Sequence, residues 1–200
     1  MTLPLREKRR QETAHQIQKA TLELAMQNGL DGVTTDEIAA ASGVSTRTFF
    51  NYYANKEAAA IGHPPPFDAA QKDALREGTG PLAADIKRFL DSHIEVLAKN
   101  EDILRMVGKI LRSNEKARGI LDGVLSAERN ALTETLCRRV DNWQTAASLA
   151  NNVTSAIGAA IFLWENEENM TLGTALDVVW EGLINASRLL SASHDEKAQS

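Results

Sequence analysis

Side chains suited to contacting a DNA duplex are concentrated between residues 45 and 56. Arg47 carries a planar set of donors that suits guanine or phosphate, and Asn51 can pair with an adenine edge. Neighbouring hydroxyl and methyl groups can contact phosphate and thymine, and a lysine follows as a second cation. Taken singly, such residues form an ordinary solvated helix face. Together they predict a DNA-contacting surface, made of Ser45, Thr46, Arg47, Thr48, Asn51, Tyr52 and Lys56.

Two short helices joined by a tight turn are expected to position these side chains. Thr34 precedes Glu37 by three residues, which is the spacing of a capping box at a helix start. Gly43 can adopt the left-handed conformation that ends a helix, and the serine two residues later can cap the next one. Phe49 and Tyr53 are four residues apart and would be buried together. This construction is typical of a helix-turn-helix, whose second helix enters the DNA major groove.

A longer helix before this pair is expected to end at Asn28 and to support it. Ile17, Thr21 and Leu24 share one face of that helix, and we expect the face to pack on Phe49 and Tyr53. Residues 1–11 are expected to form a basic arm that can follow the neighbouring phosphates.

Residues 9–57 resemble the DNA-binding domain of the tetracycline-repressor (TetR) family. The matching signature is T-T-D-E-I-A-A-A-S-G-V-S, followed by T-F-F-N-Y-Y and, two residues later, K-E. The F-F-N-Y form resembles an actinobacterial-type subgroup. The resemblance implies a homodimer of all-helical subunits with a small-molecule site in the C-terminal domain. It also implies DNA contacts by Thr35, Thr46, Arg47, Phe50, Tyr52 and Lys56.

This sequence departs from the family pattern in two places. The family most often has tyrosine where this chain has Phe50, so an apolar base or sugar contact would replace a hydroxyl contact to phosphate. The helix after Lys56 is also shorter than in much of the family, because Pro64, Pro65 and Pro66 end it. This helix connects the ligand site to the DNA-binding domain in the family, so the shortening bears on that coupling.

Composition and length predict an all-α protein with two parts. Alternating β-branched runs are absent from the 200 residues, and the pattern after residue 82 is one of long amphipathic helices. We therefore expect an N-terminal three-helix helix-turn-helix domain followed by a C-terminal helical bundle. The expected divisions are a DNA-binding domain at 1–57, a linker with proline and glycine breaks at 58–81, a ligand-binding and dimerisation domain at 82–191, and a polar tail at 192–200.

Charge and motif content narrow the function classes. Residues 1–60 hold seven basic and seven acidic groups, so the net charge of −5 arises entirely from the rest of the chain. There is no continuous apolar run of about 18 residues and no apolar signal core at the N-terminus, so we expect a cytoplasmic protein without a membrane partner. The four histidines and the single cysteine lack metal-ligand spacing, and no catalytic or cofactor motif is evident. Neither enzyme activity nor a cofactor is therefore expected.

The later helices supply two further sets of candidate residues. A set of apolar side chains with one histidine could line an effector cavity, although the same spacing suits an ordinary core: Phe89, His93, Met106, Ile110, Leu125, Leu132 and Phe162. The last two helices carry more apolar surface than one core needs, which predicts a dimer interface. Its candidate residues are Val153, Ile157, Ala160, Ile161, Trp164, Leu176, Val179, Trp180 and Leu183.

These observations predict a DNA-binding transcriptional regulator, most simply a ligand-responsive repressor that binds a palindromic operator as a homodimer. Its partners would be double-stranded DNA, a second copy of the chain and a small apolar or amphipathic effector. Two alternatives stay open from the sequence. One is a ligand-independent DNA-binding regulator or activator, and the other is a helical protein-interaction module.

Overall fold

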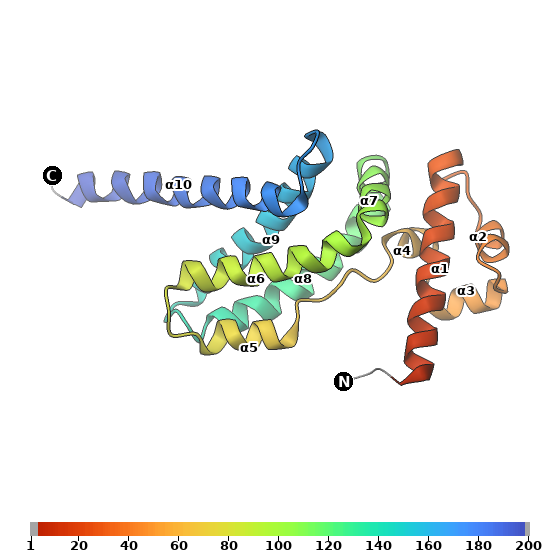
Figure 1. Ribbon diagram of the computed structural model, residues 1–200, viewed down its shortest axis with the longest axis horizontal. Coiled ribbons are helices and arrows are strands. Elements are labelled where there is room, and N and C mark those ends of the chain that lie inside the picture. The colour runs from red at the N-terminus through yellow and green to blue at the C-terminus, as the bar shows by residue number, and fades with distance from the viewer. Residues whose placement is uncertain (1–3, 199–200) are drawn as a thin grey trace. The chain divides into compact units, whose positions relative to one another are not determined.

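The computed structural model describes residues 4–198, with side chains up to residue 191, and this part of the chain is helical throughout, without strands (Figure 1). The all-α class expected from the sequence is therefore confirmed. The helices are α1 (Leu5–Asn28), α2 (Thr35–Ala41), α3 (Thr46–Tyr52), α4 (Lys56–Ile61), α5 (Ala69–Glu77), α6 (Leu82–Leu97), a short 3₁₀ turn (Ala98–Asn100), α7 (Glu101–Ser113), α8 (Glu115–Leu136), α9 (Trp143–Asn166) and α10 (Leu172–Ala198).

The chain packs as two compact units, each built from two separate stretches. The first unit contains the residues up to Pro65 together with Asn100–Val124. The second contains Pro66–Lys99 and the residues from Leu125 onward. The first unit therefore includes α7 and the first half of α8, both of which fall inside the C-terminal domain expected at 82–191. The division differs because the apolar faces of these helices cover α1 and α4.

Within the first unit, α1 contributes to two apolar clusters. Ala14 and Ile17 join Phe49 and Tyr53 in the cluster beneath the helix-turn-helix, and Leu24 packs against it. This is the support that the sequence predicted. The second cluster lies between α1, α4, α7 and α8 and contains Leu22, Ala25, Leu30, Ala60, Ile61, Ile110 and Ala117. Because α1 is covered by both clusters, it forms the central element of the first unit.

The C-terminus of α4 is held by a buried side chain of α1. Gln18 Nε2 donates to the carbonyl oxygens of Ala60 at 3.4 Å and Ile61 at 3.0 Å. These carbonyls belong to the last turn of α4, where no further helical N–H is available. Gly62 follows with φ 69°, and a Cβ at this position would lie 2.2 Å from Gln18. Glycine is favoured here by its positive φ, and a side chain at this position would displace the Gln18 amide. The helix ends at Ile61, before the three prolines.

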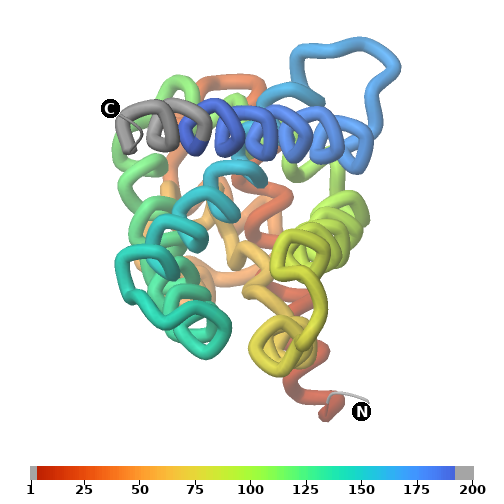
Figure 2. Tube along the Cα trace, turned by 90° about the vertical axis from the view of Figure 1, so that its left-hand side faces the viewer, coloured from red at the N-terminus to blue at the C-terminus, as the bar shows by residue number. Residues whose placement is uncertain are grey.

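In the second unit, α9 and α10 pack on each other and α6 packs against both (Figure 2). The face of α9 that enters this core consists mostly of small residues, which allow close approach of the neighbouring helices. Its buried members are Ala146, Ala150, Val153, Ala156, Ala160 and Trp164. Leu172, Ala175 and Leu176 are the buried residues at the start of α10.

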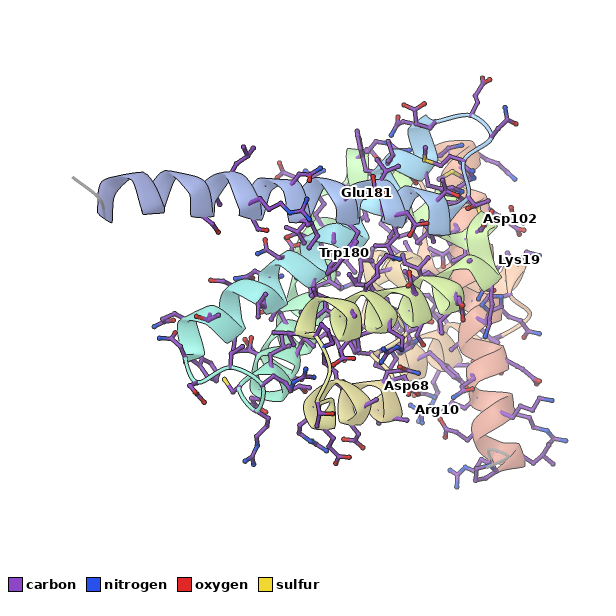
Figure 3. All side chains as sticks on the ribbon, turned by 60° about the vertical axis from the view of Figure 1, so that its left-hand side comes forward. Arg10, Lys19, Asp68, Asp102, Trp180 and Glu181 are labelled. Atoms are coloured by element: carbon purple, nitrogen blue, oxygen red, sulfur yellow. The ribbon has the colours of Figure 1, made fainter. Side chains whose placement is uncertain are left out.

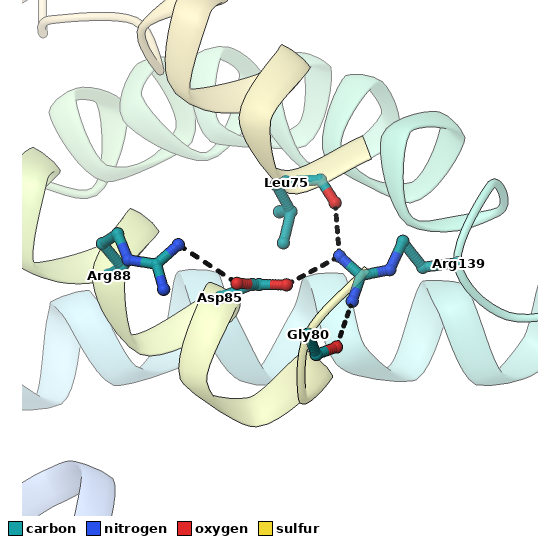
Figure 4. A network of polar contacts seen from close by, with 5 residues as sticks. All are labelled: Leu75, Gly80, Asp85, Arg88 and Arg139. Atoms are coloured by element: carbon teal, nitrogen blue, oxygen red, sulfur yellow. Dashed lines mark hydrogen bonds and ion pairs between the residues drawn. The ribbon is translucent and has the colours of Figure 1, made fainter. Parts of the chain in front are cut away.

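A charged network closes the α5–α6 connection of the second unit (Figure 4). Arg139 donates to Asp85 Oδ2 at 2.9 Å, and also to the carbonyl oxygens of Leu75 at 2.8 Å and Gly80 at 2.9 Å. Arg88 donates to the other carboxylate oxygen of Asp85 at 3.1 Å. The hydrogen bond from Arg139 is the main reason why the pKa of Asp85 lies below its usual value. The network fixes a glycine-rich turn whose own sequence would leave it mobile.

Two further features of the described residues bear on the expectations from the sequence. α9 has a mean hydropathy of 1.4 over its most apolar window, and it is long and apolar enough to cross a membrane by length and composition. Polar residues interrupt any continuous apolar run in it, and a core helix satisfies the same criteria, so the finding is weak evidence of a membrane span. The expected tail at 192–200 is helical as far as Ala198, and residues 199–200 lie outside the described part.

Candidate nucleic-acid interface

Local hydrogen bonds form the cap at the start of α2, and a glycine allows the turn between α2 and α3. Thr34 caps α2 by accepting from the Glu37 backbone N–H at 3.3 Å, and Glu37 Oε2 accepts from the Thr34 backbone N–H at 2.8 Å. The Thr34 backbone N–H and the Thr34 hydroxyl both donate to Glu37 Oε2, and these two bonds lower the pKa of Glu37. Gly43 has φ 70°, so the chain reverses without the cost that a side chain would bring. The capping box and the glycine turn are both confirmed.

The recognition helix α3 is anchored by its buried face. Ser45 caps it by accepting from the Thr48 backbone N–H at 3.1 Å, and Phe49 is fully buried. The Tyr53 hydroxyl donates to the carbonyl oxygen of Ala14 at 3.1 Å and lies 3.2 Å from His63 Nδ1. Since its single proton goes to Ala14, the histidine is the donor in the second bond. Burial raises the pKa of Tyr53 to about 12.

The outward face of α3 is narrower than the sequence predicted. Arg47, Phe50 and Asn51 are exposed, and the ring of Phe50 is 52% exposed. Thr46 and Thr48 are only half-exposed, and both hydroxyls have partners within the protein. Thr46 Oγ1 donates to Asp36 Oδ1 at 2.6 Å, and Thr48 Oγ1 lies 2.8 Å from Ser45 Oγ.

The Lys56 ammonium, which the sequence predicted at a phosphate, also has partners within the protein. Its ammonium donates to the carbonyl oxygens of Asp31 at 3.0 Å and Val33 at 2.9 Å, in the loop between α1 and α2. The side chain therefore ties the start of α4 to the loop that precedes α2, and one of its three donors is left for other partners. Thr35, the first residue of α2, is half-exposed.

The basic residues near the N-terminus belong to α1 and not to an arm. Arg6, Lys8, Arg9 and Arg10 all lie in its first two turns and are exposed. The Arg10 guanidinium lies 5.8 Å from the ring centroid of Tyr52, which is a cation–π contact between α1 and α3. Tyr52 is half-buried and also packs against the first cluster, so a basic helix end lies beside the recognition helix. No sequence spacing indicates this pair, because it joins side chains 42 residues apart.

The family model described as bacterial regulatory proteins, tetR family, matches residues 17–58, which cover the second half of α1 and all of α2 and α3. This domain belongs to the TetR family. The match includes the capping box, the glycine turn and the recognition helix, so the resemblance seen in the sequence is confirmed.

A curated relative is similar over about a quarter of the chain. It is MftR of Mycobacterium tuberculosis, described as a mycofactocin biosynthesis transcriptional regulator, and it is 43% identical over 51 residues. The match covers 26% of this chain and 26% of the relative, so the chain spans about a quarter of the length of the curated protein that it matches. The remaining residues of the chain have no counterpart in that match.

Solved TetR-family structures share the fold over most of the chain. FadR of Thermus thermophilus, in complex with lauroyl-CoA, is 21% identical with a TM-score of 0.53, and the match covers 86% of this chain and 93% of that one. FadR of Bacillus subtilis, in complex with stearoyl-CoA, is 18% identical with a TM-score of 0.53, and the match covers 84% and 95%. At these identities the likeness concerns the fold alone.

The candidate effector residues are divided between the two units of the chain. Met106 and Ile110 belong to the first unit, where Ile110 is buried in the second cluster. Phe162 is 64% exposed and faces away from any core. Leu132 is fully buried in the second unit and Leu125 is half-buried. The sequence pattern marked these positions as apolar but did not show which core each one enters.

Phe89 and His93 do lie together, beside a surface depression of the second unit. Phe67 packs on both, with ring centroids 4.9 Å from Phe89 and 4.7 Å from His93. Burial lowers the pKa of His93, and the charge of Glu128 acts in the opposite direction. The depression has a volume of about 20 Å³, room for one water, and is lined by Pro66, Phe67, Asp68, Gln71, Phe89, Ser92, His93 and Val96.

The candidate dimer residues separate into two faces of α9 and α10. Val153, Ala160, Trp164 and Leu176 are buried in the second unit, so they belong to its core and not to an intersubunit surface. The helical period places the remaining members between the core and the solvent, and they are half-exposed: Ile157, Ile161, Val179, Trp180 and Leu183. Farther out, Phe162, Val178 and Leu189 are at least half exposed. Figure 3 shows the side chains of α10 around Trp180 and Glu181.

Proposed function

We propose that this chain is a ligand-responsive transcriptional repressor that binds a palindromic operator as a homodimer. The observation that carries the proposal is the exposed set Arg47, Phe50 and Asn51 on a helix whose other face is fixed by buried Phe49 and Tyr53. A recognition helix must be rigid, because a base contact is specific only if its donors are held at a defined position in the groove.

The exposed chemistry of α3 suits base edges. Arg47 can donate two hydrogen bonds to guanine O6 and N7, and Asn51 can pair in the same way with adenine. Phe50 offers an apolar ring to a thymine methyl or to deoxyribose. The basic turns of α1, with Arg6, Lys8, Arg9 and Arg10, would contribute phosphate contacts at the side of the groove. The acidic remainder of the chain would repel DNA elsewhere.

A second copy of the chain is proposed because one short recognition helix contacts too few base pairs. Two DNA-binding heads, each the helix-turn-helix of one subunit, would be spaced by about 34–36 Å, which is one turn of DNA. They would then contact the two halves of a palindrome. The exposed apolar residues of α9 and α10 support a two-fold interface, since apolar surface of this extent on two adjacent helices usually marks an interaction site. The half-exposed Ile157, Ile161 and Trp180 would form its inner margin.

The effector is proposed to be an apolar or amphipathic small molecule. The two FadR structures that share the fold contain lauroyl-CoA and stearoyl-CoA, so acyl-CoA thioesters are the first class to test. To release DNA, such a molecule must bind the DNA-incompatible state of the dimer more tightly than the DNA-bound state. Tight binding to both states would leave repression unchanged.

Selection from a pool of random duplexes tests the DNA-binding proposal directly. We expect the protein to enrich a palindrome whose half-sites lie one helical turn apart. The logarithm of the binding constant should fall with the logarithm of salt concentration, with a slope of about −0.9 per phosphate neutralised. Enrichment of no sequence, together with binding that is insensitive to salt, would contradict the proposal and favour a protein-interaction module.

The effector proposal is tested on the selected operator. Acyl-CoA thioesters with chains of increasing length are added to the protein–operator complex, with free CoA as the control. We expect release of the operator by at least one long-chain thioester but not by CoA. If acyl-CoA and unrelated apolar compounds all leave the complex intact, a ligand-independent regulator is the better description.

A further inference from the structure

An acidic side chain lies against the first turn of the recognition helix. Asp36 is the second residue of α2 and is exposed, and its Oδ1 lies 2.6 Å from Thr46 Oγ1 at the start of α3. A carboxylate can only accept hydrogen bonds, so the Thr46 hydroxyl donates its single proton to Asp36. Thr46 is left with its oxygen lone pairs and its methyl group for any other partner.

The neighbouring hydroxyl groups are also held within the protein. Ser45 Oγ accepts from the Thr48 backbone N–H at 3.1 Å and lies 2.8 Å from Thr48 Oγ1. The start of α3 therefore presents one cation, Arg47, and one anion, Asp36, and the three hydroxyls that the sequence assigned to DNA have internal partners. The charge pattern at this end of the helix is consequently set by two side chains of opposite sign.

This placement has two consequences on a DNA duplex. In a helix-turn-helix, the N-terminal residues of the recognition helix contact base edges while the preceding helix crosses the backbone. Asp36 lies on the preceding helix but contacts Thr46, the first residue of the recognition helix. Its negative charge at this place repels a DNA phosphate wherever the fit is imperfect. The carboxylate can form a hydrogen bond only with a donor, and the donors of the major groove are the amino groups of cytosine N4 and adenine N6. Guanine and thymine present carbonyl oxygens at the corresponding positions.

We propose, on the basis of the proposed DNA-binding function, that Asp36 is a specificity-determining residue. Its second carboxylate oxygen accepts a hydrogen bond from the amino group of a cytosine or adenine in each half-site, and its charge weakens binding to DNA that lacks this group. Thr46 is a positioning residue, because its hydrogen bond to Oδ1 holds the carboxylate in one orientation. The charge of Asp36 thus lowers the overall affinity for DNA and increases the discrimination between base sequences.

The exchange Asp36→Asn tests both parts of the proposal. The amide keeps the shape and can still accept from Thr46, but it has no charge and gains two donors. In selection from random duplexes, we expect the wild type to require cytosine or adenine at one position of each half-site by about 5- to 150-fold. The variant should tolerate guanine or thymine there and keep the other preferences. It should bind a duplex without an operator about two- to fivefold more tightly per head.

Three further variants separate specific from general effects. Asp102→Asn removes an equal charge from the exposed first turn of α7, and it should change neither the selected sequence nor the binding to other DNA. Thr46→Val removes the positioning hydrogen bond but leaves the charge, so it should relax the base preference without strengthening non-specific binding. Asp36→Glu keeps the charge on a longer side chain and should alter the preference while keeping weak non-specific binding.

The outcomes distinguish this proposal from the function on which it rests. If the wild type selects no sequence, the DNA-binding function fails and not merely the role of Asp36. If the wild type selects an operator, and Asp36→Asn selects the same operator with equal stringency and unchanged affinity for other DNA, the specificity role is overturned. Thermal unfolding of each variant shows whether it folds. Should Asp36→Asn not fold, the test rests on Asp36→Glu and Thr46→Val. If both select the wild-type operator with equal stringency, the specificity role is overturned.

Discussion

At the scale of single residues, Arg47 is the side chain whose removal should affect operator binding most specifically. It is exposed on α3, and its neighbours Phe50 and Asn51 complete the outward face. We expect Arg47→Ala to weaken operator binding by about 1–3 kcal/mol and to relax the preference at one base position. Titration of labelled operator and of a random duplex measures both effects. Equal loss on the two duplexes would instead make Arg47 a phosphate contact.

Lys19→Ala is the matched control for this experiment. Lys19 is an exposed cation of α1, labelled on that helix in Figure 3, and its ammonium lies 3.8 Å from Glu23. Its removal lowers the positive charge of the first unit by the same amount. We therefore expect a small and sequence-independent change in affinity.

Tyr53 gives the first unit a dependence on alkaline pH. Its folded pKa of about 12 lies above the ordinary value of 10, so the neutral phenol is favoured in the folded state. The resulting stabilisation is complete below pH 10 and is lost as the pH rises toward 12, because the unfolded chain releases the proton first. Tyr53→Phe should therefore lose less stability than the wild type between pH 10 and pH 12.

Denaturant titrations at pH 8, 10 and 11.5 test this expectation. At pH 8, the variant should be less stable by about 0.5–1.5 kcal/mol, since the hydrogen bond to Ala14 is missing. The difference should narrow as the pH rises. A difference that stays constant would show that Tyr53 ionises at the same pH in both states.

Features set by neighbours in the sequence were the ones that could be predicted at this scale. The capping box at Thr34, the cap at Ser45 and the turn at Gly43 each depend on residues within four positions, and all three are present. The partners of Thr46 and Lys56 depend instead on how separate helices meet. Their hydroxyl and ammonium groups were therefore assigned to DNA, although the protein itself supplies acceptors for them.

At the scale of helices, α7 belongs to the core of the DNA-binding unit. Ile110 is 2% exposed and packs with Leu22 and Ala60 in the second cluster of the first unit. Ile110→Ala should lower the free energy of unfolding by about 2–5 kcal/mol, because it removes buried methyl groups and leaves a cavity. It should also weaken operator binding, since α1 would lose part of its support.

Leu132→Ala provides the comparison in the second unit, where this leucine is fully buried. We expect a similar loss of stability but a smaller effect on operator affinity measured well below the melting temperature. Hydrogen exchange should locate the loss of protection in α1 and α4 for Ile110→Ala. Loss confined to the second unit would contradict the assignment of α7.

The helix limits were more predictable than the helix partners. α1 ends at Asn28 as expected, because Gly29 with φ 72° follows it. The apolar face of α7 was also visible in the sequence, but a periodic pattern does not state what covers the face. Ile110 was consequently placed in an effector cavity, and buried core residues of α9 such as Val153 were placed at a dimer interface.

At the scale of the whole molecule, the proposed dimer depends on the outer faces of α9 and α10. Phe162 is 64% exposed and Val178 is 50% exposed. The double exchange Phe162→Glu and Val178→Glu would place four charges in an apolar contact between two copies, and we expect single subunits in sedimentation. Operator affinity should then fall by a factor of at least about 100, because a single head lacks the second, tethered contact.

Val124→Glu is the control, since Val124 is 38% exposed on α8 and lies outside α9 and α10. This variant should sediment as the wild type does. If the wild type itself sediments as a single subunit at the concentration that protects DNA, two-fold binding is excluded. A double variant that still forms dimers would place the interface elsewhere.

The two stretches that make up the first unit have a practical consequence for anyone who wishes to isolate its DNA-binding part. A fragment cut after Pro65 would keep every residue of the TetR-family match, yet it would expose the flank of α1 that carries Leu22 and Ala25 to water. Such a fragment should self-associate or melt at a low temperature. Joining Asn100–Val124 to this fragment through a glycine-rich connection would bury that flank of α1 again and give a minimal DNA-binding unit.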